Sequence, residues 1–440
     1  MKFNWLFVLA MLLLFAVGCS TEETQGDDSS DDENPETTTD GNDTGNEGTS
    51  EEENVTIRYA TFSPGEAHEE DLKAMIAAFE DIHPNIKIEY EMAAFDDYFT
   101  RLQTQIAGNN APDVLELNYE NFVSYASRGA LMDLTDLLAE DSEFDPTVLN
   151  QEAFKAFQYD GTQYGMVESF SNVVLFYNKE LFDEAGVNYP DASWTWEDEL
   201  KAAQDIMAHH DDVWGTFSPL QFWEFYKTIA QNGGGVFDDA GNIVLNSQEN
   251  IEALQWMVDK IHEYGVTPSD EQMSGQEEAD LFLDGKIAML RTGIWMFGMF
   301  ADAPFDWDIA LEPGNTAKAH HFFANGLAIS DKSEHAEAAW EWVKFMSASE
   351  EAASIRVAAS WELPAITNED VLSDYLSVTP PESREVVFDA LDSLVTPPVV
   401  EEWSRMTDMI GEELELVKLK QKTPAEALES AEERLKNILN

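Results

Sequence analysis

Hydrophobic residues after position 54 follow two different periods. Val55 to Tyr59 is apolar at every second position, and the same period returns at Ile86, Ile88 and Tyr90. The segment between them places its apolar side chains at helical spacing, at Leu72, Met75, Ile76, Phe79 and Ile82. Alternation is typical of a half-buried strand, and the helical spacing of an amphipathic helix. The pattern therefore predicts a strand, a helix and a second strand.

The same alternation continues along the chain. Tyr98, Leu102 and Ile106 predict a further helix, and residues 114–117 predict a further strand. Because strands joined by crossover helices run parallel, we expect an α/β fold built on a parallel sheet. Thr195 and Thr423 each precede a carboxylate three residues later and are predicted helix N-caps. The 386 residues from 55 to 440 exceed what one core usually serves, so two lobes are expected.

Two other segments precede residue 55. Lys2 is followed by 13 apolar residues, Trp5 to Val17, and then by Gly18 and Cys19. A membrane-spanning helix needs about 20 apolar residues, so residues 1–18 are predicted to be a signal peptide. Cys19 is the only cysteine of the chain, which excludes an intramolecular disulfide and any Cys-based site. Residues 20–54 lack aromatic and aliphatic side chains, which predicts a disordered acidic tether over 19–54.

The charge of the chain excludes one class of function. The sequence has 24 basic and 87 acidic residues, a formal net charge of −63. Without the 14 acidic residues of the tether and Lys2, the remainder still has 73 acidic and 23 basic residues, a net of −50. Nucleic-acid binding depends on Lys and Arg displacing counterions, so we expect no nucleic-acid partner. A surface this acidic also predicts a saline, halophilic exterior, where salt screens the repulsion.

Several short motifs, taken in order, resemble the family 1 extracellular solute-binding proteins, the sugar receptors of ABC importers that include maltose-binding protein. The motifs are Ala111-Pro112-Asp113-Val114, Tyr164-Gly165-Met166, the run 175–182, Ala185-Gly186, Trp194-Thr195-Trp196-Glu197, residues 326–330 and Leu363-Pro364-Ala365. The resemblance covers 55–440 and implies a type II periplasmic-binding-protein-like fold with a ligand cleft between two α/β lobes. It implies an N-terminal lobe of 55–170 and 327–368 and a C-terminal lobe of 171–326 and 369–440.

The beginning of the chain carries a second resemblance. Ala16-Val17-Gly18-Cys19 is similar to the lipobox of bacterial lipoproteins, in which the cysteine receives a lipid and becomes the first residue. This implies a monomeric receptor that is lipid-anchored at Cys19 on the extracellular face of the cytoplasmic membrane. A plain secreted protein with a chance cysteine is the alternative. The receptor would bind a sugar, pass it to the ABC permease, and need no cofactor or metal.

Candidate ligand-binding residues combine aromatic faces, which stack on the C–H faces of sugars, with a few polar groups. The resemblance places Trp295 and Trp403 where related receptors stack on sugar, with core packing as the alternative for each. Further candidates follow predicted strands, precede Gly233 or lie near the crossings between lobes: Phe62, Ser63, Asn118, Glu120, Glu168, Trp223, Tyr226, Asn325 and Trp361. Core packing of an aromatic residue and ordinary surface polarity remain the alternatives.

Other chemistries leave weaker signals. The pairs His209-His210 and His320-His321 lack the helical spacing of a zinc hydrolase motif and are predicted to be solvated loops. Glu401 and Glu402 suggest a glycoside hydrolase, but neighbours in sequence point apart and cannot flank one bond without a distant partner. The aromatic residues of so acidic a chain also suit a quaternary-ammonium osmolyte. We therefore expect a sugar-binding protein and not an enzyme. An osmolyte-binding protein and a glycoside hydrolase are the two alternatives.

Overall fold

A computed structural model describes residues 54–65 and 67–439. The predicted signal peptide, Cys19 and the tether up to residue 53 lie outside the described residues. Within the described ranges, no helix has both the length and the apolar composition that a membrane crossing requires.

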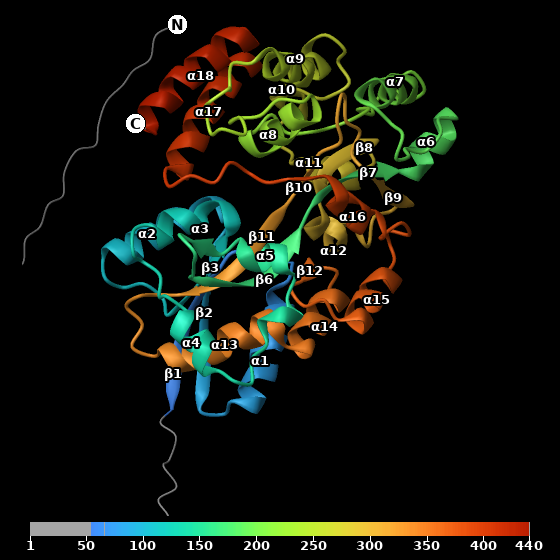
Figure 1. Cartoon of the computed structure of the whole chain (residues 1–440). Coiled ribbons are helices and arrows are strands. Elements are labelled where there is room, and N and C mark those ends of the chain that lie inside the picture. The colour runs from blue at the N-terminus through green and yellow to red at the C-terminus, as the bar shows by residue number, and fades with distance from the viewer. Residues whose placement is uncertain (1–53, 66, 440) are drawn as a thin grey trace, which may run out of the picture. The chain divides into compact units, whose positions relative to one another are not determined.

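A six-stranded sheet is built mainly from the first part of the chain (Figure 1). Its strands, in spatial order, are β12 (Leu363–Pro364), β6 (Gly165–Ser171), β11 (Phe323–Ile329), β3 (Val114–Asn118), β1 (Val55–Thr61) and β2 (Ile86–Met92). Strands β1, β2 and β3 are parallel, which confirms the predicted strand–helix–strand unit. Strand β11 is antiparallel to both β3 and β6, and it pairs Asn325 with Asn118.

Amphipathic helices pack against this sheet. They are α1 (Glu69–Ile82), α2 (Phe95–Ala107), α3 (Tyr119–Ala126), α4 (Thr135–Glu140), α5 (Gln151–Lys155), α13 (Ala336–Ala348) and α14 (Glu350–Ala358). Trp342 of α13 is completely buried, and its ring centroid lies 5.6 Å from that of Tyr59 and 5.1 Å from that of Phe79. The aromatic core thus joins β1, α1 and α13.

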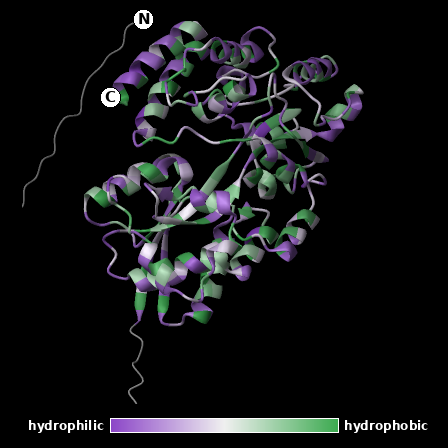
Figure 2. Ribbon diagram, in the orientation of Figure 1, coloured by the Kyte–Doolittle hydropathy of each residue, from purple (hydrophilic) through white to green (hydrophobic). Residues whose placement is uncertain are grey.

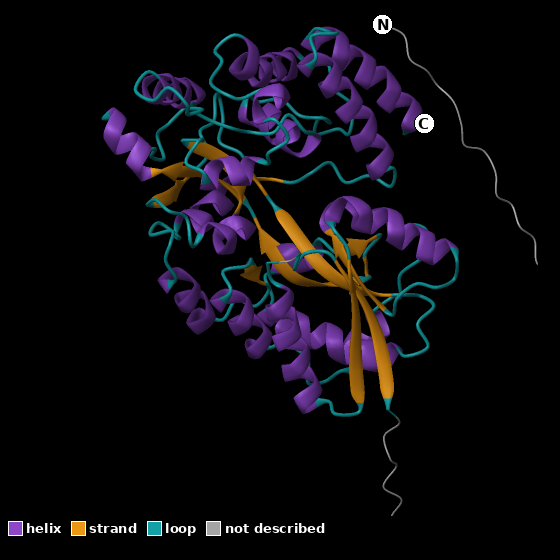
Figure 3. Ribbon diagram, turned by 180° about the vertical axis from the view of Figure 1, so that it is seen from behind, coloured by secondary structure: helices purple, strands orange, loops and turns teal. Residues whose placement is uncertain are grey.

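A second, three-stranded antiparallel sheet has the order β8 (Met289–Gly293), β7 (Val173–Asn178), β9 (Trp307–Ala310). Only Asn172 separates β7 from β6, and only Phe322 separates β11 from β10 (His320–His321). The chain therefore leaves the six-stranded sheet at Asn172 and enters it again after Phe322. Figure 3 shows these strands from behind.

The remaining helices surround the second sheet or follow it. They are α6 (Lys179–Ala185), α7 (Trp196–Met207), α8 (Phe222–Gln231), α9 (Gln248–His262), α10 (Asp270–Met273), α11 (Glu278–Leu283), α12 (Phe297–Phe300), α15 (Glu369–Ser377), α16 (Val386–Asp389), α17 (Trp403–Lys418) and α18 (Pro424–Ile438). Thr195 and Thr423 cap α7 and α18 in full capping boxes, as predicted. Hydrophobic and hydrophilic residues alternate along most of these helices (Figure 2), as expected of helices that pack on a core.

Short elements complete the described chain. They are β4 (Gln158–Tyr159), β5 (Thr162–Gln163), β13 (Leu394–Val395) and the 3-10 turns η1 (Pro146–Val148), η2 (Ile294–Met296) and η3 (Ala390–Ser393). Strand β10 pairs with β13 in parallel and both of its histidines are buried. The prediction that His320-His321 is a solvated loop is therefore wrong, because β13 lies more than 70 residues away in sequence and its pairing leaves no local signal.

Candidate functional site

Three partly exposed aromatic rings lie together although they come from distant segments. They belong to Trp223 of α8, Trp295 of η2 and Phe323 at the start of β11. The ring centroid of Phe323 is 5.9 Å from that of Trp295 and 6.5 Å from that of Trp223. The buried ring of His321 stacks on Phe323 at 5.0 Å and lies 5.2 Å from Trp223. We call these four residues the aromatic group.

The position of Trp295 depends on a glycine. Strand β8 continues through Gly293, and η2 begins at the next residue. A Cβ atom on Gly293 would lie 2.0 Å from the Trp295 ring, which no side chain can tolerate. The ring therefore lies directly over the backbone of Gly293. The absence of a side chain at Gly293 is what permits this arrangement.

His321 presents a free acceptor atom within the aromatic group. Its Nε2–H donates to the backbone oxygen of Trp223 at 2.7 Å, which leaves Nδ1 as the unprotonated nitrogen. No other described residue provides a hydrogen-bond partner for Nδ1. Burial, reinforced by the charge of Lys227, holds the pKa of His321 well below its usual value, so the ring is neutral.

Tyr226 and Glu120 bring two more unpartnered polar atoms to the same place. The Tyr226 ring lies 5.3 Å from that of His321, and its hydroxyl has no partner among the described residues. Glu120, in the first turn of α3, is 6% exposed, and its Oε2 is equally unpartnered within the described chain. Burial raises the pKa of Glu120 to about 7. Burial and the nearby Glu120 carboxyl raise the pKa of Tyr226 well above its usual value.

Four predicted site residues lie in or just after strands of the six-stranded sheet, and three of them make polar contacts there. The Ser63 N–H donates to Glu116 Oε2 at 3.2 Å, and Asn118 Oδ1 accepts from Asn121 Nδ2 at 2.9 Å. Asn325 Nδ2 donates to Glu362 Oε2 at 3.3 Å. Phe62 packs against other aromatic rings, with centroids 5.3 Å from Phe95, 5.1 Å from Tyr98 and 5.7 Å from Phe99.

Glu168 and Trp361 lie in a different buried cluster. Arg356 forms an ion pair with Glu168, and its guanidinium lies 4.2 Å from the centre of the Trp361 ring. The Trp361 ring also stacks on the His68 ring, with the centroids 4.8 Å apart. Burial raises the pKa of Glu168 to about 8, although Arg356 acts in the opposite direction. The ion pair and the ring contacts of this cluster involve none of the four residues of the aromatic group.

Trp403 begins α17 and is 9% exposed. Its ring centroid lies 5.6 Å from that of Phe222, which in turn lies 5.7 Å from that of Tyr226. Trp403 therefore belongs to the hydrophobic core around α8 and α17 and reaches the aromatic group only through intervening rings.

A network of buried ion pairs holds α8 in place. Lys227 Nζ lies 2.8 Å from Glu224 Oε1 and 2.6 Å from Glu312 Oε1, and all three side chains are at most 1% exposed. Arg291 of β8 pairs with Glu199 of α7 and lies 3.6 Å from Glu312. These long-range pairs fix α8, and with it Trp223 and Tyr226, against β8 and the segment after β9.

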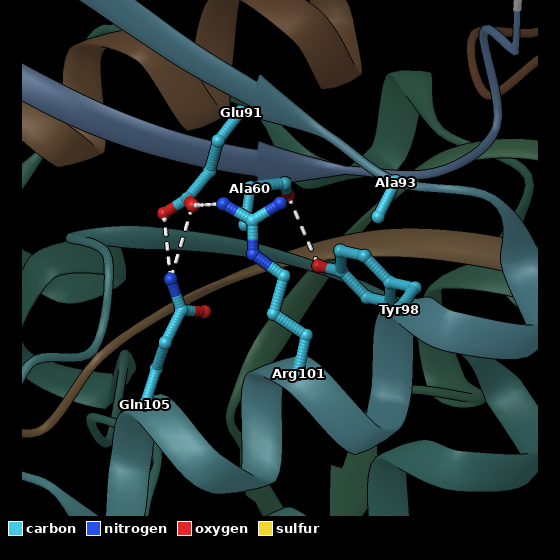
Figure 4. Close-up of a pocket in the computed structure, with 6 residues that line it drawn as sticks. All are labelled: Ala60, Glu91, Ala93, Tyr98, Arg101 and Gln105. Carbon is cyan, nitrogen blue, oxygen red and sulfur yellow. Dashed lines mark hydrogen bonds and ion pairs between the residues drawn. The ribbon is translucent and has the colours of Figure 1, made fainter. Parts of the chain in front are cut away.

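Two hollows lie elsewhere in the described residues. A cavity of about 10 Å³ beside β1, β2 and α2 has room for little more than one water molecule (Figure 4). There Glu91 binds Arg101 and Gln105, and Tyr98 donates to the Ala60 oxygen. An open pocket of about 370 Å³ between α9, α17 and α18 lacks Trp, Tyr and Phe in its lining. No cluster of His, Asp or Glu side chains suited to a metal ion occurs in the described ranges.

Residues 65–353 match the sequence profile of the bacterial extracellular solute-binding proteins. The chain is 25% identical to the arabinooligosaccharide-binding protein of Bacillus subtilis, with 98% of each chain covered. Its identity to the arabinooligosaccharide-binding protein of Halalkalibacterium halodurans is also 25%, over 80% of this chain and 82% of the other.

A solved structure of an ABC substrate-binding protein from Listeria monocytogenes, in complex with cycloalternan, superposes with a TM-score of 0.85. The two sequences are 49% identical, and the match covers 88% of this chain and 99% of the other. These likenesses confirm the predicted fold class, the two-lobed type II periplasmic-binding-protein fold.

Proposed function

Because this chain belongs to the family of bacterial extracellular solute-binding proteins, we propose that it captures a neutral mono- or oligosaccharide and delivers it to the permease of an ABC importer. The observation that carries this proposal is the aromatic group, whose half-exposed Trp223, Trp295 and Phe323 rings offer faces to a sugar. Sugars combine flat C–H faces with a rim of hydroxyls, so such rings and nearby polar atoms are complementary to them. The family and the relatives are binding proteins, and the proposed function makes and breaks no bond.

The proposed mechanism is closure of two lobes around the ligand. We place the N-terminal lobe at 55–170 and 327–368 and the C-terminal lobe at 171–326 and 369–440. The proposed hinges lie close to two of these boundaries, at Asn172 and Phe322, because a single residue separates consecutive strands at each. Periplasmic binding proteins close around their ligands by hinge motion of their two domains. A ligand shifts the equilibrium toward the closed form only if it binds that form better, so contacts from both lobes are required.

The proposed ligand contacts come from both lobes. Trp223, Tyr226 and Trp295 would contribute from the C-terminal lobe, and Phe62, Ser63, Asn118 and Glu120 from the N-terminal lobe. Trp403 stays a candidate for the core-packing role that was its alternative, since it packs against Phe222. Asn325, Glu168 and Trp361 stay candidates near the crossings. His321 and Phe323 join this set because of their place in the aromatic group.

The proposed location is outside the cell, as the family implies, with the receptor held at the membrane by a lipid on Cys19. The acidic tether would hold the folded part away from the membrane, because its like charges extend it. We propose that the receptor acts as a monomer and without a cofactor.

A thermal-shift screen tests the proposed function, since a bound ligand stabilises the folded state by mass action. The screen contains cycloalternan, arabinooligosaccharides and maltodextrins on one side, and betaine and choline on the other. Stabilisation by a saccharide that is reduced in Trp295→Ala supports the proposal. Stabilisation by betaine or choline alone supports the osmolyte alternative. Release of reducing sugar from the stabilising saccharide would instead indicate a glycoside hydrolase.

A further inference from the structure

Three buried polar atoms beside the aromatic group lack a hydrogen-bond partner in the described part of the chain. Glu120 Oε2, Tyr226 Oη and His321 Nδ1 come from α3, α8 and β10, and none has a hydrogen-bond partner within the described residues. The great majority of buried polar atoms in proteins have a hydrogen-bond partner, so a buried atom without one calls for an explanation. Three of them beside half-exposed aromatic rings call for a single explanation.

The hydrogen-bonding capacity of the three atoms is complementary to hydroxyl groups. The Tyr226 hydroxyl is protonated and donates. His321 Nδ1 accepts, because the Nε2–H already donates to the Trp223 oxygen at 2.7 Å. Glu120 accepts when it is a carboxylate. A sugar hydroxyl both donates and accepts, so two or three neighbouring hydroxyls satisfy all three atoms at once.

We propose that Glu120, Tyr226 and His321 bind adjacent hydroxyl groups of the saccharide, and that Glu120 accepts its hydrogen bond as a carboxylate. The inference rests on the proposed function and adds a regulatory property to the same site: saccharide capture is linked to the release of a proton. Glu120 belongs to the first proposed lobe and the other two residues to the second, so these contacts also give the ligand a reason to favour closure.

Burial, and not a neighbouring charge, is the main cause of the raised pKa of Glu120. Helix α3 contacts β3, β11 and α17, and its own titratable side chains besides Glu120 are Tyr119 and Tyr125. On these neighbours, and on the elements α8 and β10 that carry Tyr226 and His321, the titratable side chains are Glu116 of β3, Glu224, Tyr226 and Lys227 of α8, His320 and His321 of β10, and Arg405, Asp408, Glu412, Glu413, Glu415 and Lys418 of α17. Glu116 is bound by Thr61, and Lys227 by Glu224 and Glu312. Arg405, Glu412, Glu413 and Lys418 form ion pairs elsewhere, and Asp408 is exposed.

The sign of the linkage follows from the raised pKa. Burial brings the pKa of the empty site's Glu120 to about 7, and hydroxyl donors stabilise the carboxylate and lower that pKa. The saccharide therefore binds best above pH 7, and binding weakens as the pH falls below 7 and protonates the empty site. With a pKa of about 7, the dissociation constant at pH 5.5 should be roughly 30-fold larger than at pH 8.5.

Calorimetric titration with cycloalternan at pH 5.5 and 8.5 tests the inference. We expect the ratio of the two dissociation constants to be about 30 in the wild type and about 1 in Glu120→Gln. Asp136→Asn, an exposed carboxyl change on α4, is the matched control and should retain the wild-type ratio. At pH 7 the wild type should release about half a proton on binding, measured in two buffers of different ionisation enthalpy.

Tyr226→Phe keeps the ring and removes only the donor, so it should weaken binding at both pH values while retaining the ratio. If Glu120→Gln does not fold, Tyr226→Phe and the number of protons that the wild type releases on binding still test the inference. A wild-type ratio near 1, or a ratio near 30 that persists in Glu120→Gln, overturns the inference while leaving the sugar receptor intact. A failure of cycloalternan and all other tested saccharides to bind at either pH overturns the proposed function and this inference with it.

Discussion

Replacing Gly293 with Ala tests how the fold positions the aromatic group. The backbone at Gly293 has a φ of −82°, which alanine adopts without strain. The added methyl would, however, meet the ring of Trp295 at 2.0–2.2 Å, so the ring must move. The substitution therefore displaces one stacking surface while leaving every other side chain of the proposed site unchanged in identity.

The expected loss follows from the contact that the ring provides. An aromatic contact adds about 0.5–1.5 kcal/mol beyond the apolar area that it buries, and that area contributes about 25 cal/mol per Å². The two terms together reach at least about 1.4 kcal/mol. A loss of this size makes the dissociation constant about tenfold larger. We expect Gly293→Ala and Trp295→Ala each to weaken saccharide binding about tenfold, and the double variant to be no weaker than Trp295→Ala alone.

Calorimetric titration of the saccharide found by the thermal-shift screen measures these constants, and a melting curve for each variant reports folding. Gly411→Ala is the control, because a Cβ at this position in α17 meets no atom within 4 Å. It should leave affinity unchanged and stabilise the helix by about 1 kcal/mol. Wild-type affinity in Gly293→Ala, or a double variant with fully additive losses, would refute the argument that Gly293 acts by seating Trp295.

Three further predictions concern stability and anchoring. Trp403→Ala should lower the free energy of unfolding by about 3–5 kcal/mol, because Trp403 is buried against Phe222; an unchanged urea midpoint would contradict its place in the core. Cys19→Ala should release the protein into the medium or leave an unprocessed precursor, as membrane extraction would show, whereas a mature, detergent-requiring product would contradict lipid anchoring. The melting temperature should rise between low and molar sodium chloride, since salt screens the acidic surface; a flat curve would count against the saline habitat.

Local patterns predicted those parts of the fold that depend on neighbours in sequence. The strand–helix–strand unit from Val55 to Met92 follows from hydrophobic period alone, and the caps at Thr195 and Thr423 follow from residues within one helical turn. Pairings between distant residues left no such signal. Glu168 and its partner Arg356 are 188 residues apart, so the sequence could not show that this carboxyl is buried and paired.

The candidate site likewise contains some residues that the sequence predicted and others that it did not. Trp223 and Trp295 were predicted because a tryptophan after a strand or before glycines is conspicuous, and the resemblance supported Trp295. Phe323 and His321 were missed, because their place in the aromatic group depends on β10 pairing with β13 and on the chain entering β11 directly afterwards. A sequence shows which residues can stack or bond, but only the fold shows which of them meet.

A crystal structure of the protein with the saccharide that stabilises it most tests the central claim directly. We expect a sugar ring with its C–H face against Trp295 or Phe323, and hydroxyl groups at Glu120, Tyr226 and His321. A saccharide bound elsewhere, for example in the open pocket between α9, α17 and α18, with the aromatic group uncovered, would contradict it.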